Sequence, residues 1–259
     1  MSDAVEVDNL VDGPADGPSV VLSGSLGSDM RMWEPQVPAL AEAGYRVVRY
    51  DHRGHGGSPV PPGPYSLADL GYDVLALLDR LRIRRAHFVG LSLGGMVGMW
   101  LGGHAPDRLR TLTLCCTSAE LGPPSGWAER AAVVRAQGTG AVAAAAVGRW
   151  FTPQWRAAHP ESTSAYEAMV AATPAEGYAS CCAAIETMDI AKHLATISAP
   201  TLVIAGADDP ATPPPHAERI VEAIPVVRLE ILSPAAHLAN VEQPDAINGL
   251  ILGHLKENS

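Results

Sequence analysis

Residues 86–94 read Ala-His-Phe-Val-Gly-Leu-Ser-Leu-Gly, an apolar run that leads into the pattern Gly-x-Ser-x-Gly with Ser92 at its centre. This pattern is typical of a sharp turn between a strand and a helix, which exposes the serine hydroxyl. Gly90 and Gly94 remove side chains that would collide across the turn. We predict a helix over 95–101, with its first amides and positive dipole end directed at the serine. A glycine-rich turn that merely contains a serine is the alternative.

Short β-branched runs alternate with helical windows along most of the chain. We predict strands at 19–23, 45–50, 86–89, 109–115, 201–205 and 227–232, and helices near 35–43, 67–81, 95–101, 214–224 and 244–255. Alternating strands and helices indicate a mostly parallel sheet with helices on both faces. The predicted fold class is therefore α/β.

The stretch 120–197 differs from the rest because it is rich in alanine, has helical character and lacks strand signals. We predict that it forms a helical cap inserted into a core made of residues 1–119 and 198–259. The alternative is a continuation of the core with long crossover connections.

The charge and composition of the chain limit the classes of partner that we expect. The 259-residue chain has a net charge of −10, which argues against nucleic acid or an anionic membrane as partner. No run of about 18 apolar residues is present, so no membrane span is expected. The first six residues are acidic and lack an apolar core, so we expect no secretory signal. Oligomeric state is not predicted.

The four cysteines occur as two adjacent pairs, Cys115-Cys116 and Cys181-Cys182. They have no metal-binding spacing with histidine, so neither a metal site nor a cofactor is expected. We interpret them as reduced thiols that pack like small hydrophobic residues, which indicates a cytoplasmic location.

If Ser92 is a nucleophile, an acid and then a histidine should follow it in the chain. The predicted strand 201–205 leads to Asp208 and Asp209, and the strand 227–232 leads to His237. The carboxyl ends of parallel strands are where ligand chemistry gathers in open α/β sheets. His237 would accept the serine proton, and the acid would fix the imidazole tautomer. We prefer Asp209 as that acid and interpret Asp208 as a solvated neighbour.

The other histidines are weaker candidates for the base. His52 and His55 precede Ser92, so we interpret them as residues of a turn or of the rim of the site, and His87 lies within a predicted strand. An oxyanion hole needs two backbone N–H groups aimed at the developing charge. We assign the amides of Leu93, directly after the serine, and of Leu26, in the loop after the first strand.

Several segments now match a known family. They are Ser23–Asp29 with Met32-Trp33, Asp51–Gly56, Gly90–Gly98, Gly122-Pro123-Pro124 with Trp127 and Arg130, Arg149–Pro153, Thr173–Tyr178, Asp209–Pro214 and Ala236–Pro244. Through them nearly the whole chain resembles α/β-hydrolases and, more narrowly, the 3-oxoadipate enol-lactonases of protocatechuate degradation. It departs from them at Gly24, where asparagine is frequent, and at Asp208, where histidine is common. Some relatives also carry a fused decarboxylase domain that this chain lacks.

The resemblance implies hydrolysis of the enol-lactone of 3-oxoadipate through an acyl-enzyme, in the β-ketoadipate pathway. Because this small lactone is an anion, the pocket should hold a cation, and arginine binds carboxylates in a bidentate manner. Arg130 and Arg149 are candidates, flanked by Trp127 and Trp150, with Arg130 preferred. For each arginine, a solvated helix charge beside core aromatics is the alternative.

Two other functions fit the same sequence. Another ester or thioester hydrolase, or a haloperoxidase-like relative, would use the same residues on a different acyl group, since fold resemblance does not identify substrate. A hydrolase-fold protein that binds a ligand without turnover is the more remote possibility.

Overall fold

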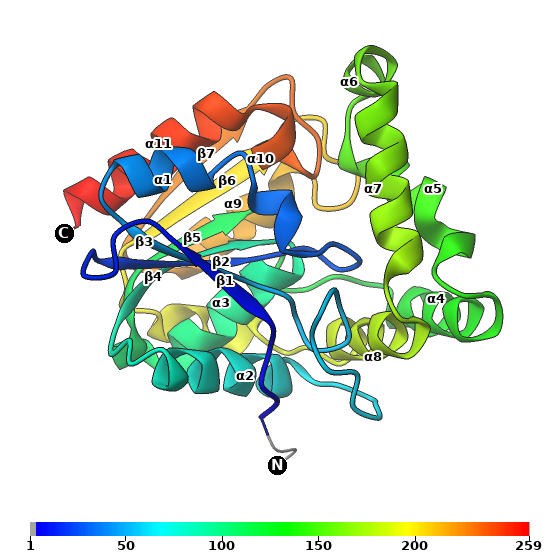
Figure 1. Ribbon diagram of the computed structural model, residues 1–259, viewed down its shortest axis with the longest axis horizontal. Helices are drawn as coiled ribbons and strands as arrows, with labels where there is room; N and C mark the ends of the chain where they lie inside the picture. The colour runs from blue at the N-terminus through cyan, green and yellow to red at the C-terminus, as the bar shows by residue number, and fades with distance from the viewer. Residues whose placement is uncertain (1–3, 259) are drawn as a thin grey trace.

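The computed structural model describes residues 4–258 and centres on one seven-stranded sheet (Figure 1). The strands are β1 (Asn9–Asp12), β2 (Ser19–Ser23), β3 (Arg46–Tyr50), β4 (Ala86–Leu91), β5 (Leu109–Cys115), β6 (Thr201–Gly206) and β7 (Val227–Leu232). Their order is β1-β3-β2-β4-β5-β6-β7. β1 pairs antiparallel with β3, and every other neighbouring pair is parallel. The α/β class predicted from the sequence is confirmed.

Helices cover both faces of the sheet, as Figure 1 shows. One face carries α1 (Val37–Glu42) and α11 (Pro244–Glu257), and the other carries α2 (Leu67–Arg80) and α3 (Leu93–His104). The short α9 (Pro214–Ala223) packs on β6 and β7, and α10 (Ala239–Glu242) precedes α11. The central strands β2, β4 and β6 are buried along their whole length, because helices lie on both sides of them.

Between β5 and β6 the chain forms an inserted helical region. It contains α4 (Pro124–Gln137), α5 (Gly140–Trp150), α6 (Pro153–Ala158), α7 (Pro160–Ala172) and α8 (Ala175–Glu186), followed by a 3-10 helix at Ala191–Thr196. α4 packs on α8 and α5 packs on α7, to one side of the sheet (Figure 1). The predicted insertion of helices between strands is therefore present, while the division at residues 120 and 197 stays a prediction.

Within the described chain, no helix is long and apolar enough to cross a membrane. The four cysteines are buried and unpaired. The expectation about the first six residues concerns a segment of which residues 1–3 lie outside the described part.

Candidate active site

The turn at Ser92 joins β4 to α3. Ser92 has φ 57° and ψ −113°, a left-handed conformation that costs free energy for a residue with a side chain. The positions on either side of Ser92, Gly90 and Gly94, have no room for a side chain. A Cβ on Gly90 would lie 2.2 Å from the carbonyl oxygen of Gly94, and one on Gly94 would lie 2.1 Å from that of Ser23.

Two hydrogen bonds hold this strained turn. The N–H of Ser92 donates to the carbonyl oxygen of Cys115 (2.9 Å), and the hydroxyl of Thr117 donates to the carbonyl oxygen of Ser92 (2.7 Å). Both partners come from the end of the neighbouring strand β5 or just beyond it. No local sequence pattern predicts the role of Thr117, because that role depends on the pairing of β5 with β4.

His237 and Asp209 meet at the carboxyl ends of β7 and β6. The Nδ1 of His237 lies 2.8 Å from Oδ2 of Asp209, and both side chains are buried. Thr212 donates its hydroxyl to the same Oδ2 (2.7 Å), and the N–H groups of Ala211 and Thr212 donate to Oδ1. The acid is therefore fixed in place on both of its oxygens.

Burial raises the pKa of Asp209, but the charge of His237 and the hydrogen bonds from His237 and Thr212 outweigh it, so the net pKa is lowered. Asp209 is thus a carboxylate at neutral pH. It accepts a hydrogen bond from the Nδ1–H group of His237, which leaves Nε2 free to act as a base.

Asp208 points elsewhere and braces the loop that carries His237. Its N–H donates to the carbonyl oxygen of Ala235 (2.9 Å), and its carboxylate accepts from the N–H of Ala235 (3.3 Å). Of the two aspartates, Asp209 is the one hydrogen-bonded to His237, while its role as the catalytic acid stays a prediction.

The amides assigned to an oxyanion hole stand out from their neighbours. On either side of Leu26, the N–H of Ser25 donates to Sδ of Met32 and that of Gly27 donates to Nε2 of His55. The amides that flank Leu93 are also engaged, by Cys115 and by Gly24. Within residues 4–258, the N–H groups of Leu26 and Leu93 have no hydrogen-bond partner. Unpaired amides of this kind are what an oxyanion requires.

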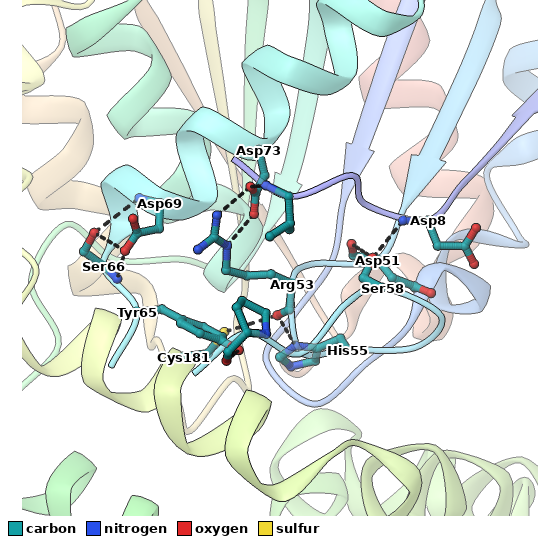
Figure 2. Close-up of polar contacts among 12 residues, drawn as sticks. Asp8, Asp51, Arg53, His55, Ser58, Tyr65, Ser66, Asp69, Asp73 and Cys181 are labelled. Carbon is teal, nitrogen blue, oxygen red and sulfur yellow. Dashed lines mark hydrogen bonds and ion pairs between the residues drawn. The ribbon is translucent and has the colours of Figure 1, made fainter. Parts of the chain in front are cut away.

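His52 and His55 are buried, and the N–H of His55 donates to the carbonyl oxygen of His52 (2.9 Å). Of the two alternatives that the sequence left open, a turn or the rim of the site, they therefore lie in a turn. His55 accepts from Gly27 at Nε2 (2.9 Å), and its Nδ1 therefore donates to the carbonyl oxygen of Arg53 (Figure 2). His52 lies 3.1 Å from the carbonyl oxygen of Gly24. Burial lowers the pKa of His52 to about 3 and that of His55 to about 4, so both are neutral supports of the loop.

Side-chain contacts of Arg53 and Asp51 also hold the loop after β3 in place. Arg53 forms a buried ion pair with Asp73 of α2 (2.6 Å), as Figure 2 shows. Asp51 accepts from the N–H groups of Met30 (2.6 Å) and Gly57 (2.9 Å). Burial raises the pKa of Asp51 to about 6.

Ser92 and His237 line one cavity of about 270 Å³ beneath the inserted helices. Most of its other lining residues come from the loop that carries Leu26 and from α4, α5 and α8, and the rest come from α3, the segment before α4 and the loop after β6. Among them are Leu26, Trp127, Arg130, Arg149, Trp150 and Tyr178. In residues 4–258, no hydrogen bond joins the Ser92 hydroxyl to His237. Catalytic hydrogen bonds are often long without substrate and tighten when it binds.

Two arginines in this cavity lack a carboxylate partner among the described residues. The guanidinium of Arg130 lies between the rings of Trp127 (5.6 Å) and Tyr178 (5.4 Å), an arrangement that favours a cation. Burial lowers the pKa of Arg149, and the positive charge of Arg130 lowers it further. Within an acidic protein, the cavity wall is therefore locally cationic and uncompensated.

Glu242 of α10 links the inserted helices to the loop 233–238, which carries His237 and is called the histidine loop below. One carboxylate oxygen accepts from the N–H and the hydroxyl of Thr152, and the other accepts from the N–H of Ala236 (2.8 Å). The N–H of Leu238 also donates to the carbonyl oxygen of Trp150 (2.8 Å). Glu242 lies in the segment Ala236–Pro244, which resembles the family, but the resemblance does not assign it this role.

Comparisons with known proteins agree with this geometry. Residues 18–244 match the model of the alpha/beta hydrolase fold. The chain is 43% identical to 3-oxoadipate enol-lactonase 2 of Acinetobacter baylyi, over 94% of this chain and 91% of that protein. It is 35% identical to a Variovorax paradoxus protein assigned as a carbamate hydrolase, RutD, over 95% of this chain and 94% of that one.

A crystal structure of the enol-lactonase from Burkholderia xenovorans LB400 superposes with a TM-score of 0.95, at 40% identity and with 97% of each chain covered. The similarity thus extends over the core and the inserted helices together. This chain belongs to the α/β-hydrolase fold family and is similar to the 3-oxoadipate enol-lactonases within it.

Proposed function

We propose that this protein hydrolyses the enol-lactone of 3-oxoadipate to 3-oxoadipate, as a step in aromatic degradation through protocatechuate. The observation that carries the proposal is the cavity itself, where Ser92 and His237 share a wall with the uncompensated Arg130 and Arg149. Such a cavity suits a small anionic acyl compound. The similarity to enol-lactonases over 94% of the chain supports the same substrate.

In the proposed mechanism, Oγ of Ser92 attacks the lactone carbonyl while Nε2 of His237 accepts its proton. The amides of Leu26 and Leu93 receive the oxyanion of the tetrahedral intermediate. The ring C–O bond then breaks, and His237 protonates the departing enol oxygen. Tautomerisation of the enol to a ketone draws the ring opening forward.

The opened chain stays attached to Ser92 as an ester. His237 then removes a proton from water, which attacks the acyl carbonyl, and the Ser92 oxygen leaves with the proton that His237 returns. Asp209 stabilises the imidazolium in both half-reactions. The proposed product carries two carboxylates, and no cofactor enters the reaction.

Arg130 is our preferred partner for the free carboxylate of the lactone. Its ring contacts hold the guanidinium in the cavity while leaving its N–H groups for a bidentate anion. Trp127 and Trp150 would form the apolar wall against the ring of the substrate.

Arg130→Ala tests this assignment. We expect KM for the anionic lactone to rise about 10- to 100-fold, the value of a charged hydrogen bond, with KM for a neutral ester nearly unchanged. Arg135→Ala is the matched control, because Arg135 lies on the same helix but pairs with Glu176 outside the cavity. Equal losses on both substrates would rule out a carboxylate-binding role for Arg130.

Hydrolysis of a carbamate is the second candidate, favoured by the 35% identity to the RutD protein. Comparing kcat/KM for the enol-lactone, a carbamate and a neutral ester separates the candidates. Labelling of Ser92 by a fluorophosphonate separates any hydrolase from a protein that only binds ligand. The cytoplasmic location inferred from the cysteines also stays a prediction.

A further inference from the structure

The strand β7 lies at one edge of the sheet and pairs with β6 alone. The N–H of Thr201 donates to the carbonyl oxygen of Val226 (2.9 Å), and that of Ala207 donates to the carbonyl oxygen of Leu232 (2.8 Å). Backbone groups alternate in direction along a strand. The N–H and C=O groups of residues 227, 229 and 231 therefore point away from the sheet, and no part of residues 4–258 hydrogen-bonds to them.

This edge has few of the devices that usually prevent pairing. The strand contains no proline, no lysine and no bulge in its ladder with β6, and its two charged residues, Arg228 and Glu230, are of opposite sign. Two apolar residues at this edge are exposed to solvent: Ile231 in the strand is 47% exposed, and Val226, just before it, is 55% exposed. An uncovered apolar edge strand is a template for another strand.

The sequence of the strand is complementary to itself in reverse. Residues 226–232 read Val-Val-Arg-Leu-Glu-Ile-Leu, with Leu229 at the centre, opposite charges beside it and apolar residues at both ends. We propose that two copies of this chain pair antiparallel through β7, about a two-fold axis at Leu229, and so extend the sheet across the dimer.

The backbone directions fit this register. Leu229 faces the partner's Leu229, and Val227 faces the partner's Ile231, so all the outward groups meet as hydrogen-bonded pairs that exchange both bonds. Arg228 then lies opposite the partner's Glu230 in both halves of the interface. Opposite charges directly across a ladder stabilise it, whereas a parallel arrangement would align like charges.

Within one copy, Arg228 contacts Glu257 of α11 at 3.3 Å, with both side chains well exposed. An exposed pair of this kind contributes little free energy, so Arg228 can turn toward a second carboxylate. The active-site cavity does not include β7, and the proposed dimer therefore stands independently of the proposed reaction.

Disulfide trapping tests directly whether Leu229 faces its own copy in the proposed dimer. Leu229→Cys places two thiols across the axis with Cα atoms about 5.5 Å apart, within the range of a disulfide. All four native cysteines are buried, so they do not compete. In the control Val226→Cys, the more exposed residue lies about 20 Å along the ladder from its own copy. We expect mild oxidation to link Leu229→Cys into dimers and to leave Val226→Cys unlinked.

Charge exchange gives a second, independent test on the uncrosslinked protein. By light scattering, wild type should have twice the 27.1 kDa mass of the chain. Glu230→Arg should give the monomer mass, and the double variant Arg228→Glu/Glu230→Arg should restore the dimer. A monomeric wild type, a dimer that survives Glu230→Arg, or equal crosslinking of the two cysteine variants would overturn the proposal.

Discussion

Asp209 controls His237 through a hydrogen bond of 2.8 Å, and its other bonds keep it in the orientation that selects one imidazole tautomer. Asp209→Asn keeps the shape of the side chain but removes the charge and favours the wrong tautomer. We expect kcat to fall about 10,000-fold with little change in KM. Asp208→Asn is the matched control, since it alters the adjacent carboxylate. Comparable kcat values for the two variants would contradict the assignment of the acid.

His55 gives the fold a pH dependence. Burial holds its pKa at about 4 in the folded protein, whereas an unfolded chain has a value of about 6.5. Below about pH 6.5 the unfolded state therefore binds the additional proton, and stability is lost as pH falls toward 4.

His55→Gln should remove this part of the dependence while still accepting from the N–H of Gly27. Across that pH window, the free energy of unfolding of the variant should fall less steeply than that of wild type, by up to about 1.4 kcal/mol per pH unit. Urea unfolding at several pH values measures the difference. Parallel curves would show that folding does not shift the pKa of His55 and would contradict this prediction.

The sequence located the main candidate residues because each follows a strand that its pattern predicts. Ser92 follows β4, Asp209 follows β6 and His237 follows β7. Thr117, Thr212 and His55 carried no such signal, because their roles come from contacts between segments far apart in the chain. For His52 and His55 the sequence left a turn and a rim position open, because it does not show that another loop covers them.

At the scale of elements, α10 holds the histidine loop and the inserted helices together through Glu242. Replacing Glu242 by alanine would leave the N–H groups of Ala236 and Thr152 without an acceptor. We expect unfolding free energy to fall by about 2 kcal/mol or more, and kcat to fall because His237 loses its position. Glu242→Gln retains one acceptor oxygen and should lose less of both. Unchanged stability and kcat in Glu242→Ala would show that this link is dispensable.

The long buried strands were predicted to within a residue or two, since β-branched runs bounded by turns mark them clearly. The strand β1 was missed. It has four residues, is half-exposed and pairs antiparallel at the sheet edge, so its pattern is short and only partly apolar. The individual helices of the inserted region were also not resolved, because an alanine-rich stretch has helical character throughout.

At the scale of the molecule, the net charge of −10 contrasts with the cationic wall that Arg130 and Arg149 give to the cavity. An anion that enters must therefore be recognised locally, against the overall field. Composition alone does not reveal this cationic wall, because it comes from two residues that the packing of α4 and α5 brings together.

The most direct test follows the enol-lactone itself, generated enzymatically and monitored by its loss of absorbance, with wild type and Ser92→Ala at matched concentration. We expect rapid hydrolysis by wild type and a fall in kcat of at least about 10,000-fold in the variant, with folding unchanged by circular dichroism. Absence of turnover by the folded wild type, or equal rates for the two proteins, would contradict it.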